Sequence, residues 1–368
     1  MTDKPLPSLL ERIRTARSVQ AVRAAERELL RRIRSGSGTP VIELETAHFF
    51  FRSEDDVSVS VSGDWNRWQA DKQRLVRLHP RSVLLHTEQD FPIDAALPYR
   101  LIVDGESVLD PMNQRILPGP LGTNSFFSMP AYPGVPYWHL SENDVPRGRL
   151  IELYAEGNAS VSGRVVGIYI PHDHEPNGTE RFLYVNDGAE AISIGRFNTV
   201  LDNIYRFEPF TPNTIVVFVP PVDRHGEYMM NPDFARWFAN DLTKQVEKRL
   251  NVTSRASLRT IQGASLGGLF AAFVGLQHSN RFRNIVSQSP SFWVDDFSIV
   301  RQFERTKRLP LRWYLHTGTI SDGRTEARKM LQVLRAKGND VCYRETSESH
   351  NWANWAGQYA AIVRWIGK

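Results

Sequence analysis

The spacing of apolar residues changes twice along this 368-residue chain. Over residues 7–34, apolar side chains recur every three or four positions with arginines between them, which predicts an amphipathic helix packed on the next domain. Over residues 43–127, apolar and polar side chains alternate, most clearly at 57–62, which predicts half-buried β-strands. From about residue 150, short β-branched runs alternate with helical segments, which is typical of an α/β fold with a mostly parallel sheet.

Turn-forming residues indicate where these parts meet. SerGlySerGlyThrPro at 35–40 ends the predicted helix, and a stretch rich in proline and glycine follows the β-rich part. The sequence therefore predicts four segments, namely an N-terminal amphipathic helix (1–38), a small β-sandwich (39–130), a linker (131–149) and an α/β domain (150–368).

The α/β part contains clear candidates for individual elements. Strands are expected at 164–170, 181–185, 214–219, 258–262, 283–287, 311–316 and 340–346. Helices are expected at 233–250, 266–277 and about 352–366.

Charge and cysteine content change this picture only slightly. Residues 1–36 hold nine basic and four acidic residues, whereas the rest of the chain holds 36 basic and 37 acidic residues. The net charge of +4 therefore comes from the first segment. A nucleic-acid or membrane-surface role would depend on that segment alone, and we expect neither. The single cysteine, Cys342, allows no internal disulfide, and the charged N-terminus lacks an apolar signal region. Together they predict a cytoplasmic protein.

A candidate nucleophile lies in Gly263-Ala264-Ser265-Leu266-Gly267, which fits the G-x-S-x-G pattern. The motif follows a predicted strand and opens a predicted helix, which is where α/β hydrolases hold a serine on a sharp turn. Small residues are needed because helix and strand approach each other closely. A glycine-rich turn without a catalytic role is the alternative. The pattern predicts an α/β hydrolase with Ser265 as its nucleophile.

A serine nucleophile needs a general base, which in this fold follows the serine in the chain. Three histidines follow Ser265. His278 lies on the helix that the motif opens, and His316 lies inside a predicted strand. His350, on a late loop, is therefore the predicted base.

The base in turn needs an acid to orient it. Asp322 lies on the loop after the strand expected at 311–316, so it is the predicted acid. Glu326, one helical turn further, is the competitor, and a Ser–His dyad is a third possibility.

Acyl transfer also needs donors for the oxyanion that develops on the substrate carbonyl. One should be the backbone N–H of the residue after the nucleophile, and another should come from the loop after an earlier strand. These rules predict that the backbone N–H groups of Leu266 and of Gly188 or Ala189 donate to the oxyanion.

The β-rich part resembles the early-set immunoglobulin-like domains that precede isoamylase-type enzymes and occur in glycogen-binding modules. ValSerGlyAspTrpAsnArgTrp (61–68) and TyrArgLeuIleValAspGlyGluSerValLeuAspProMetAsn (99–113) carry the resemblance. In carbohydrate-binding relatives, exposed tryptophans stack on sugar rings. Trp65 and Trp68 could do so here, or could only pack the sandwich.

Residues 150–368 resemble the esterase-D-like branch of the α/β hydrolases, and within it the enterochelin esterases, cytoplasmic enzymes that open ferric catecholate trilactones. The matching segments are AspGly at 187–188, ValAspArgHisGlyGluTyrMetMetAsnProAspPhe at 222–234, the GlyAlaSerLeuGlyGly motif, and SerGlnSerProSerPheTrp at 287–293. Feruloyl and acetyl esterases of carbohydrates share much of this pattern. The resemblance supports the catalytic roles of the serine, histidine and acid named above.

The same resemblance suggests residues that contact the substrate. It implies that Arg224 lines the pocket, where a cation suits an anionic tris-catecholate. An ion pair with Glu227 or Asp223 is the alternative role for this arginine. Trp293, Trp352 and Trp355 could form an aromatic wall, or could pack the core.

The sequence thus predicts a serine esterase that acts on a small-molecule ester, with a catecholate siderophore trilactone as the first candidate. The alternative is an acyl-carbohydrate (feruloyl or acetyl) esterase that holds its glycan with the β-sandwich. A third candidate, a binding module with a vestigial hydrolase fold, fits poorly with a full set of catalytic residues. We expect no cofactor and no metal, since HisAspHis at 172–174 is better explained as a solvated loop. The oligomeric state is not determined by the sequence.

Overall fold

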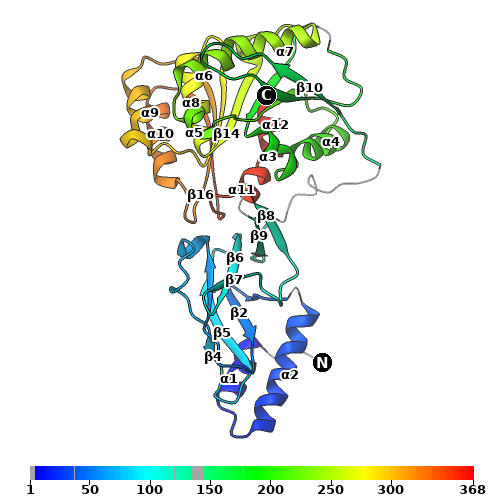
Figure 1. Cartoon of the computed structure of the whole chain (residues 1–368), viewed down its shortest axis with the longest axis vertical. Helices are drawn as coiled ribbons and strands as arrows, with labels where there is room; N and C mark the ends of the chain where they lie inside the picture. Colours follow the sequence, from blue (N-terminus) through cyan, green and yellow to red (C-terminus); the bar gives the residue numbers. More distant parts are fainter. Residues whose placement is uncertain (1–4, 37, 120–121, 134–143, 177) are drawn as a thin grey trace. The chain divides into compact units, whose positions relative to one another are not determined.

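The computed structural model describes residues 5–36, 38–119, 122–133, 144–176 and 178–368 (Figure 1). Contacts between residues divide the chain into two compact units. The first unit holds residues 1–134 and 347–349, and the second holds 135–346 and 350–368. Most of the predicted linker, 131–149, lies outside the described residues.

The first unit contains a β-sandwich of two antiparallel sheets. The first sheet has the order β1 (Val41–Glu43), β2 (Thr46–Arg52), β5 (Leu84–Asp90), β4 (Val76–Arg77). The second has the order β3 (Val59–Gly63), β6 (Ala96–Val103), β9 (Gly122–Ser128), β8 (Ile116–Gly119), with β7 (Glu106–Val108) beside β6. The predicted β-sandwich before the α/β domain is confirmed.

Aromatic rings fill the interior of the sandwich. Phe49, Trp65, Tyr99 and Phe127 pack together with ring centres 5.2–6.0 Å apart. Trp65 is thus a packing residue, whereas Trp68 is 40% exposed. β3 is buried along its whole length, although alternation had predicted a half-buried strand. Small serine hydroxyls tolerate burial, so alternation in polarity does not require alternation in exposure.

The N-terminal segment forms two helices, α1 (Leu6–Arg14) and α2 (Val19–Ser35), where one was expected. Ser18 begins the second, because its hydroxyl accepts a hydrogen bond from the Ala21 N–H at 3.2 Å. The apolar faces of both helices pack on the first sheet, for example against Phe50. The basic residues therefore belong to a helix pair that is anchored on the sandwich.

The face of the first sheet that carries Phe50 also carries two buried histidines. His48 lies two residues before Phe50 on β2. His86 lies on the neighbouring strand β5, directly opposite Phe50. Burial lowers the pKa of His86 to about 3 and also lowers the pKa of His48, so both rings are neutral at neutral pH.

The second unit is built on an eight-stranded sheet with the order β10-β11-β13-β12-β14-β15-β16-β17. The strands are β10 (Arg149–Ala155), β11 (Arg164–Ile170), β12 (Phe182–Asn186), β13 (Ile215–Val219), β14 (Arg259–Ala264), β15 (Asn284–Gln288), β16 (Arg312–Gly318) and β17 (Asp340–Thr346). The pairs β10–β11 and β11–β13 are antiparallel and all others are parallel. The predicted mostly parallel sheet is confirmed, and all seven predicted strands lie within two residues of observed ones.

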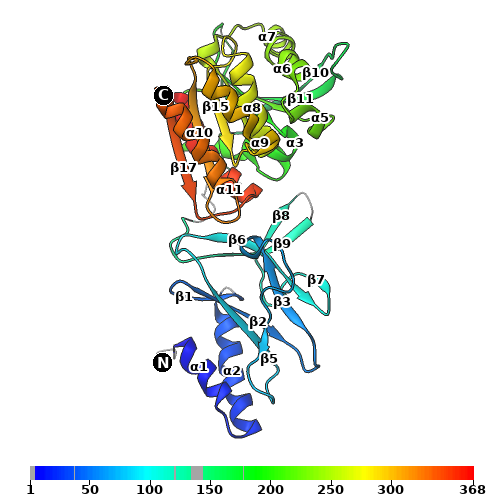
Figure 2. The ribbon, with the colours of Figure 1, turned by 90° about the vertical axis from the view of Figure 1, so that its left-hand side faces the viewer.

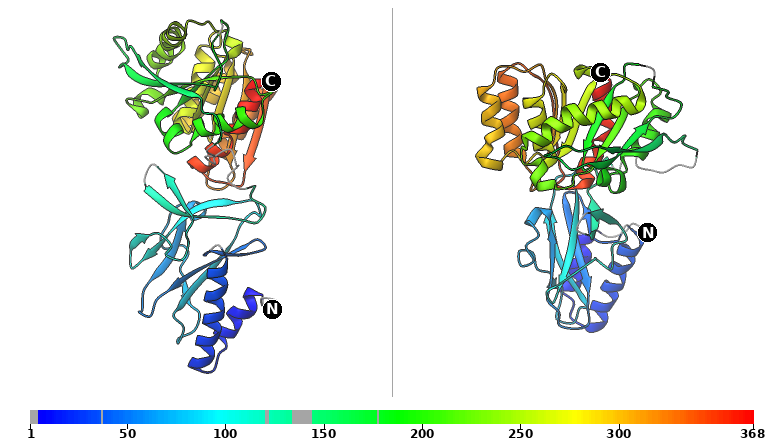
Figure 3. Two further views of the ribbon diagram at one scale, coloured as in Figure 1. Left: turned by 90° about the vertical axis from the view of Figure 1, so that its right-hand side faces the viewer. Right: turned by 45° about the horizontal axis from the view of Figure 1, so that its top comes forward.

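Helices cover both faces of this sheet (Figure 2, Figure 3). One buried cluster joins the sheet to α5 (Arg224–Tyr228), α6 (Pro232–Arg236), α7 (Thr243–Leu250), α8 (Leu266–Gln277), α9 (Val294–Arg305) and α10 (Arg324–Ala336), with a π-helical segment at Trp237–Leu242 between α6 and α7. The other joins it to α3 (Gly188–Ser193), α4 (Phe197–Phe207), α11 (Trp352–Gly357) and α12 (Tyr359–Gly367). In the described part of the chain, no helix has the length and apolar content needed to cross a membrane.

Candidate active site

The candidate nucleophile makes a sharp turn between a strand and a helix. β14 ends at Ala264 and α8 begins at Leu266, so Ser265 alone turns the chain. Its φ of 58° and ψ of −122° are strained for a residue with a side chain. The Ser265 N–H donates to the Gln288 carbonyl at 2.9 Å, which ties the turn to the end of β15. The hydroxyl lies 3.4 Å from the Ser291 hydroxyl.

Gly263 allows α8 to pack tightly against β14. A Cβ atom at this position would lie 2.2 Å from the Gly267 carbonyl oxygen. The predicted need for small residues at this turn therefore has a direct cause in the close approach of helix and strand.

His350 and Asp322 form the acid–base pair of the site. The His350 Nδ1 lies 2.8 Å from Asp322 Oδ1, which leaves Nε2 on the opposite side of the ring. The Asp322 side chain is fully buried. Burial alone would raise the pKa of this carboxyl, but the hydrogen bond and charge of His350, with other donors, lower its pKa below the usual value. Among described residues, Glu326 makes no hydrogen bond to His350.

Ser289 holds the acid in place and was not singled out from the sequence. Its hydroxyl donates to Asp322 Oδ2 at 2.6 Å and accepts from the Trp355 indole N–H at 2.9 Å. It stands two residues before Ser291, which faces the Ser265 hydroxyl. One loop after β15 thus contacts both the serine and the acid–histidine pair. The described chain contains no direct hydrogen bond between Ser265 and His350.

The loop predicted to complete an oxyanion hole lies beside the nucleophile turn. A Cβ atom at Gly267 would be 3.3 Å from Asp187 Oδ2, so α3 and α8 begin next to each other. The Asp187 N–H donates to the Tyr228 hydroxyl at 3.0 Å. The next N–H groups, of Gly188 and Ala189, begin α3, where a helix has no preceding carbonyl to accept them.

At α8, Gly268 and Leu269 donate to the Ser265 carbonyl at 3.0 and 3.1 Å. The N–H of Leu266 comes before them, in the part of the first turn that lacks an acceptor within the helix. The predicted donors thus come from two neighbouring helix N-termini.

Arg224 forms its ion pair with Asp187, in the loop before α3, and not with Glu227 or Asp223 as considered from the sequence. Its Nε and Nη2 donate to the two oxygens of Asp187 at 2.7 and 3.0 Å. Glu227 instead forms a buried bidentate pair with Arg164, with both distances 2.7 Å. Although burial lowers the pKa of Arg224, the hydrogen bond and charge of Asp187 outweigh it and raise that pKa, so the guanidinium is charged.

The predicted tryptophans differ in position. Trp355 is buried and its ring meets His350 edge-on at 5.1 Å. Trp352 packs edge-on against Trp355 at 5.2 Å and against the adjoining core. Trp293 follows the Ser289–Ser291 loop and is 59% exposed. The aromatic surface near the histidine therefore comes from α11.

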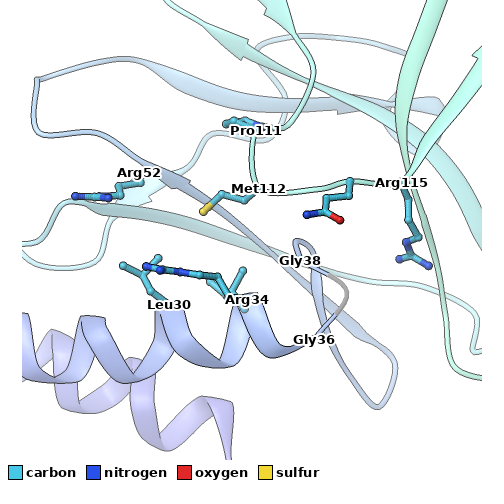
Figure 4. Close-up of a pocket in the computed structure, with 10 residues that line it drawn as sticks. Leu30, Arg34, Gly36, Gly38, Arg52, Pro111, Met112 and Arg115 are labelled. Atoms are coloured by element: carbon cyan, nitrogen blue, oxygen red, sulfur yellow. The ribbon is translucent and has the colours of Figure 1, made fainter.

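The first unit has a pocket of its own, of about 970 Å³ (Figure 4). Figure 4 shows it between α2 and the segment that carries Pro111 and Met112. Its lining combines apolar side chains with Arg34, Arg52 and Arg115. None of the predicted catalytic residues belongs to it.

Comparison with known proteins gives a family match over most of the second unit. The family model described as "Putative esterase" matches residues 161–366, which is more than half of the chain.

Individual relatives agree with this match. The iron(III) enterobactin esterase of Escherichia coli O6:H1 is 27% identical over 241 residues, covering 61% of this chain and 58% of its own length. Among solved structures, the enterobactin esterase of Shigella flexneri, crystallised in the presence of enterobactin, has a TM-score of 0.74 at 18% identity and covers 90% of this chain and 96% of that one. A ferulic acid esterase has a TM-score of 0.52 at 15% identity, and the match covers 60% of this chain and 98% of the ferulic acid esterase.

Proposed function

Since this chain belongs to the Esterase family and is a carboxylic ester hydrolase, we propose that it hydrolyses esters through an acyl-enzyme formed on Ser265. The observation that carries the proposal is the buried Asp322 carboxylate, hydrogen-bonded to His350 at 2.8 Å in the unit that also contains the strained serine turn. This pair resembles the acid–base half of a catalytic triad.

In the proposed mechanism, His350 Nε2 removes the proton from the Ser265 hydroxyl as the oxygen attacks the ester carbonyl. Asp322 holds the Nδ1–H tautomer and stabilises the imidazolium that forms. His350 then protonates the leaving alcohol, and later deprotonates the water that releases the acid. The Ser265–His350 hydrogen bond would form when substrate binds, since such contacts are often long in unliganded enzymes.

The developing oxyanion would be bound by the N–H groups of Leu266 and of Gly188 or Ala189. They belong to the first turns of α3 and α8, which begin next to each other, and the positive end of each helix dipole favours the oxyanion. The loss of one such donor typically raises the barrier by about 3–4 kcal/mol.

For the substrate we propose a catecholate siderophore trilactone of the enterobactin type. Support comes from the enterobactin esterases, which match this chain in sequence and, over 90% of its length, in fold. Arg224, with Nη1 directed away from the two nitrogens that bind Asp187, would donate to a catecholate oxygen, and Trp293 and Trp352 would contact the aromatic rings. A single cysteine suits the reducing cytoplasm, where we place this reaction.

The second candidate is a feruloyl or acetyl esterase of carbohydrates. The fold shared with a ferulic acid esterase favours it, as does the exposed Trp68 of the sandwich, which could stack on a sugar ring. Asp187 partly neutralises Arg224, which would suit a less anionic substrate than a tris-catecholate.

Two experiments test the proposal in order. Hydrolysis of p-nitrophenyl acetate should disappear in Ser265→Ala and persist in Ser193→Ala, an exposed serine on α3. Unchanged turnover in Ser265→Ala would refute the mechanism.

The second experiment is chromatography after incubation with ferric enterobactin and, separately, with feruloylated oligosaccharide. It should show linear catecholoyl-serine products from ferric enterobactin and no release of ferulate from the oligosaccharide. Cleavage of the oligosaccharide alone would favour the second candidate.

A further inference from the structure

We propose that the first unit binds a divalent transition-metal ion, with Zn²⁺ as the type case, through His48, His86 and Glu88. These residues lie on the first sheet of the β-sandwich, and the site is independent of the esterase function proposed above. Their potential ligand atoms all lie within 4.8 Å of one another.

The strand register brings the three side chains together. β2 and β5 are antiparallel, and His48 is directly opposite Glu88. His86 is two residues before Glu88 on the same strand, so it lies on the same face of the sheet. Neighbouring and diagonal positions on one face of an antiparallel pair are close enough for their side chains to share one ligand.

The distances fit a metal ion better than a set of hydrogen bonds. His48 Nδ1 is 3.1 Å from both His86 Nε2 and Glu88 Oε2, and His86 Nε2 is 3.7 Å from Glu88 Oε2. Metal–ligand bonds of about 2.0–2.2 Å in a tetrahedron place ligand atoms about 3.3–3.6 Å apart. The three observed separations surround that value. One Nδ1–H could not serve two acceptors equally well, whereas one cation could bind all three atoms.

Burial and packing fix the two imidazoles. Both rings are about 95% buried, and they stack with centres 5.4 Å apart and planes 18° apart. His86 also packs on Phe50 with ring centres 4.9 Å apart. The ligands are therefore held in place before an ion binds, which lowers the ordering cost of binding.

The chemistry of the ligands selects the class of ion. Two imidazoles and a carboxylate suit zinc and other transition metals rather than Ca²⁺ or Mg²⁺, which prefer oxygen. The Glu88 side chain is about half exposed, so the site is open to solvent on the side of this ligand. Three protein ligands with an open fourth position differ from closed structural zinc sites, which have four protein ligands. The charge of Arg14 opposes binding, and Glu43 and Asp90 favour it.

Cobalt provides the test, because four- or five-coordinate Co²⁺ absorbs visible light. The full chain, without an affinity tag and after dialysis against EDTA, is titrated with CoCl₂ and then with ZnCl₂. We expect a saturable visible band at one equivalent that Zn²⁺ abolishes. His86→Gln and Glu88→Gln should weaken binding at least about tenfold, since even residues that only orient metal ligands contribute roughly 10–100-fold.

The matched control is His172→Gln combined with His174→Gln, which removes a histidine pair from the second unit and should leave the band unchanged. Glu88 is exposed, so Glu88→Gln should fold even if His86→Gln does not, and circular dichroism checks both. Absence of the band, or the same Co²⁺ affinity in wild type and Glu88→Gln, would overturn the proposal.

Discussion

Asp322 accepts hydrogen bonds on both carboxylate oxygens. Oδ1 faces His350 and the Gly323 N–H, and Oδ2 accepts from Ser289 and from the Gly318 N–H at 2.7 Å. These contacts keep the carboxylate charged although it is buried, because together they outweigh the burial that raises its pKa. Its charge and fixed position give it two roles in the proposed mechanism, namely selecting the His350 tautomer and stabilising the imidazolium.

Asp322→Asn should therefore lower kcat by about 10³–10⁴ with little change in KM, because an amide facing Nδ1 favours the wrong tautomer. The measurement is steady-state hydrolysis of p-nitrophenyl acetate. Glu326→Gln, one helical turn away, is the control and should remain near wild type. The assignment of the acid would be reversed if Glu326→Gln lost activity and Asp322→Asn kept it.

His316 predicts a pH dependence of stability. It is fully buried on β16, and its Nε2 lies 3.1 Å from the Thr346 hydroxyl. Burial lowers its pKa to about 4, below the usual 6.5. As pH falls below 6.5, His316 becomes protonated in the unfolded chain but stays neutral in the folded chain. The free energy of unfolding therefore decreases between pH 6.5 and pH 4. Between pH 6.5 and 4.5, His316 alone should lower the free energy of unfolding by roughly 2–3 kcal/mol.

His316→Gln keeps a hydrogen-bonding group near Thr346 and does not titrate in this range. Its melting temperature should therefore fall less between pH 7.5 and 4.5 than that of wild type. Thermal unfolding followed by circular dichroism measures this difference, and His172→Gln, at a half-exposed histidine, should behave like wild type. Parallel falls in wild type and His316→Gln would exclude His316 as the cause.

At the scale of elements, the junction of β14 and α8 positions the nucleophile. Gly263→Ala would place a Cβ atom 2.2 Å from the Gly267 carbonyl, so the helix would have to move away from the strand. We expect a loss of about 2–3 kcal/mol in stability. We also expect at least a roughly tenfold loss in kcat, because a displacement of about 1 Å can cost a hundredfold.

Gly357→Ala is the control for this substitution, since a Cβ atom at that position of α11 would have no atom within 4 Å apart from its chain neighbours and the nearby backbone of its own helix. Its melting temperature and activity should stay close to wild type. Normal activity and stability in Gly263→Ala would mean that the turn does not depend on close packing.

Elements with a strong periodic pattern could be predicted from the sequence, whereas contacts between elements could not. The strands at 164–170 and 340–346 and the helix at 266–277 have the bounds that were expected. The N-terminal helix was predicted as one because apolar spacing continues across the break at Ser18.

In the candidate site, chain order and loop position were enough to suggest Ser265, His350 and Asp322. Ser289 was missed because its role depends on the neighbouring strand, which brings Asp322 to it. The His48, His86 and Glu88 cluster was missed for a similar reason. Its members are up to 40 residues apart, and only the register of β2 and β5 unites them.

At the scale of the whole molecule, the predicted catalytic groups all belong to the second unit. That unit has two hydrophobic clusters of its own, one on each face of its sheet, and every member lies between residues 151 and 366. A unit with its own core is expected to fold alone. A chain of residues 144–368 should therefore hydrolyse p-nitrophenyl acetate with kcat/KM within about threefold of the full chain.

Far-ultraviolet circular dichroism and thermal unfolding must first show that this shortened chain is folded. A folded shortened chain without activity on the small ester would mean that the first unit supplies part of the active site. The catalytic machinery would then not be confined to the α/β domain.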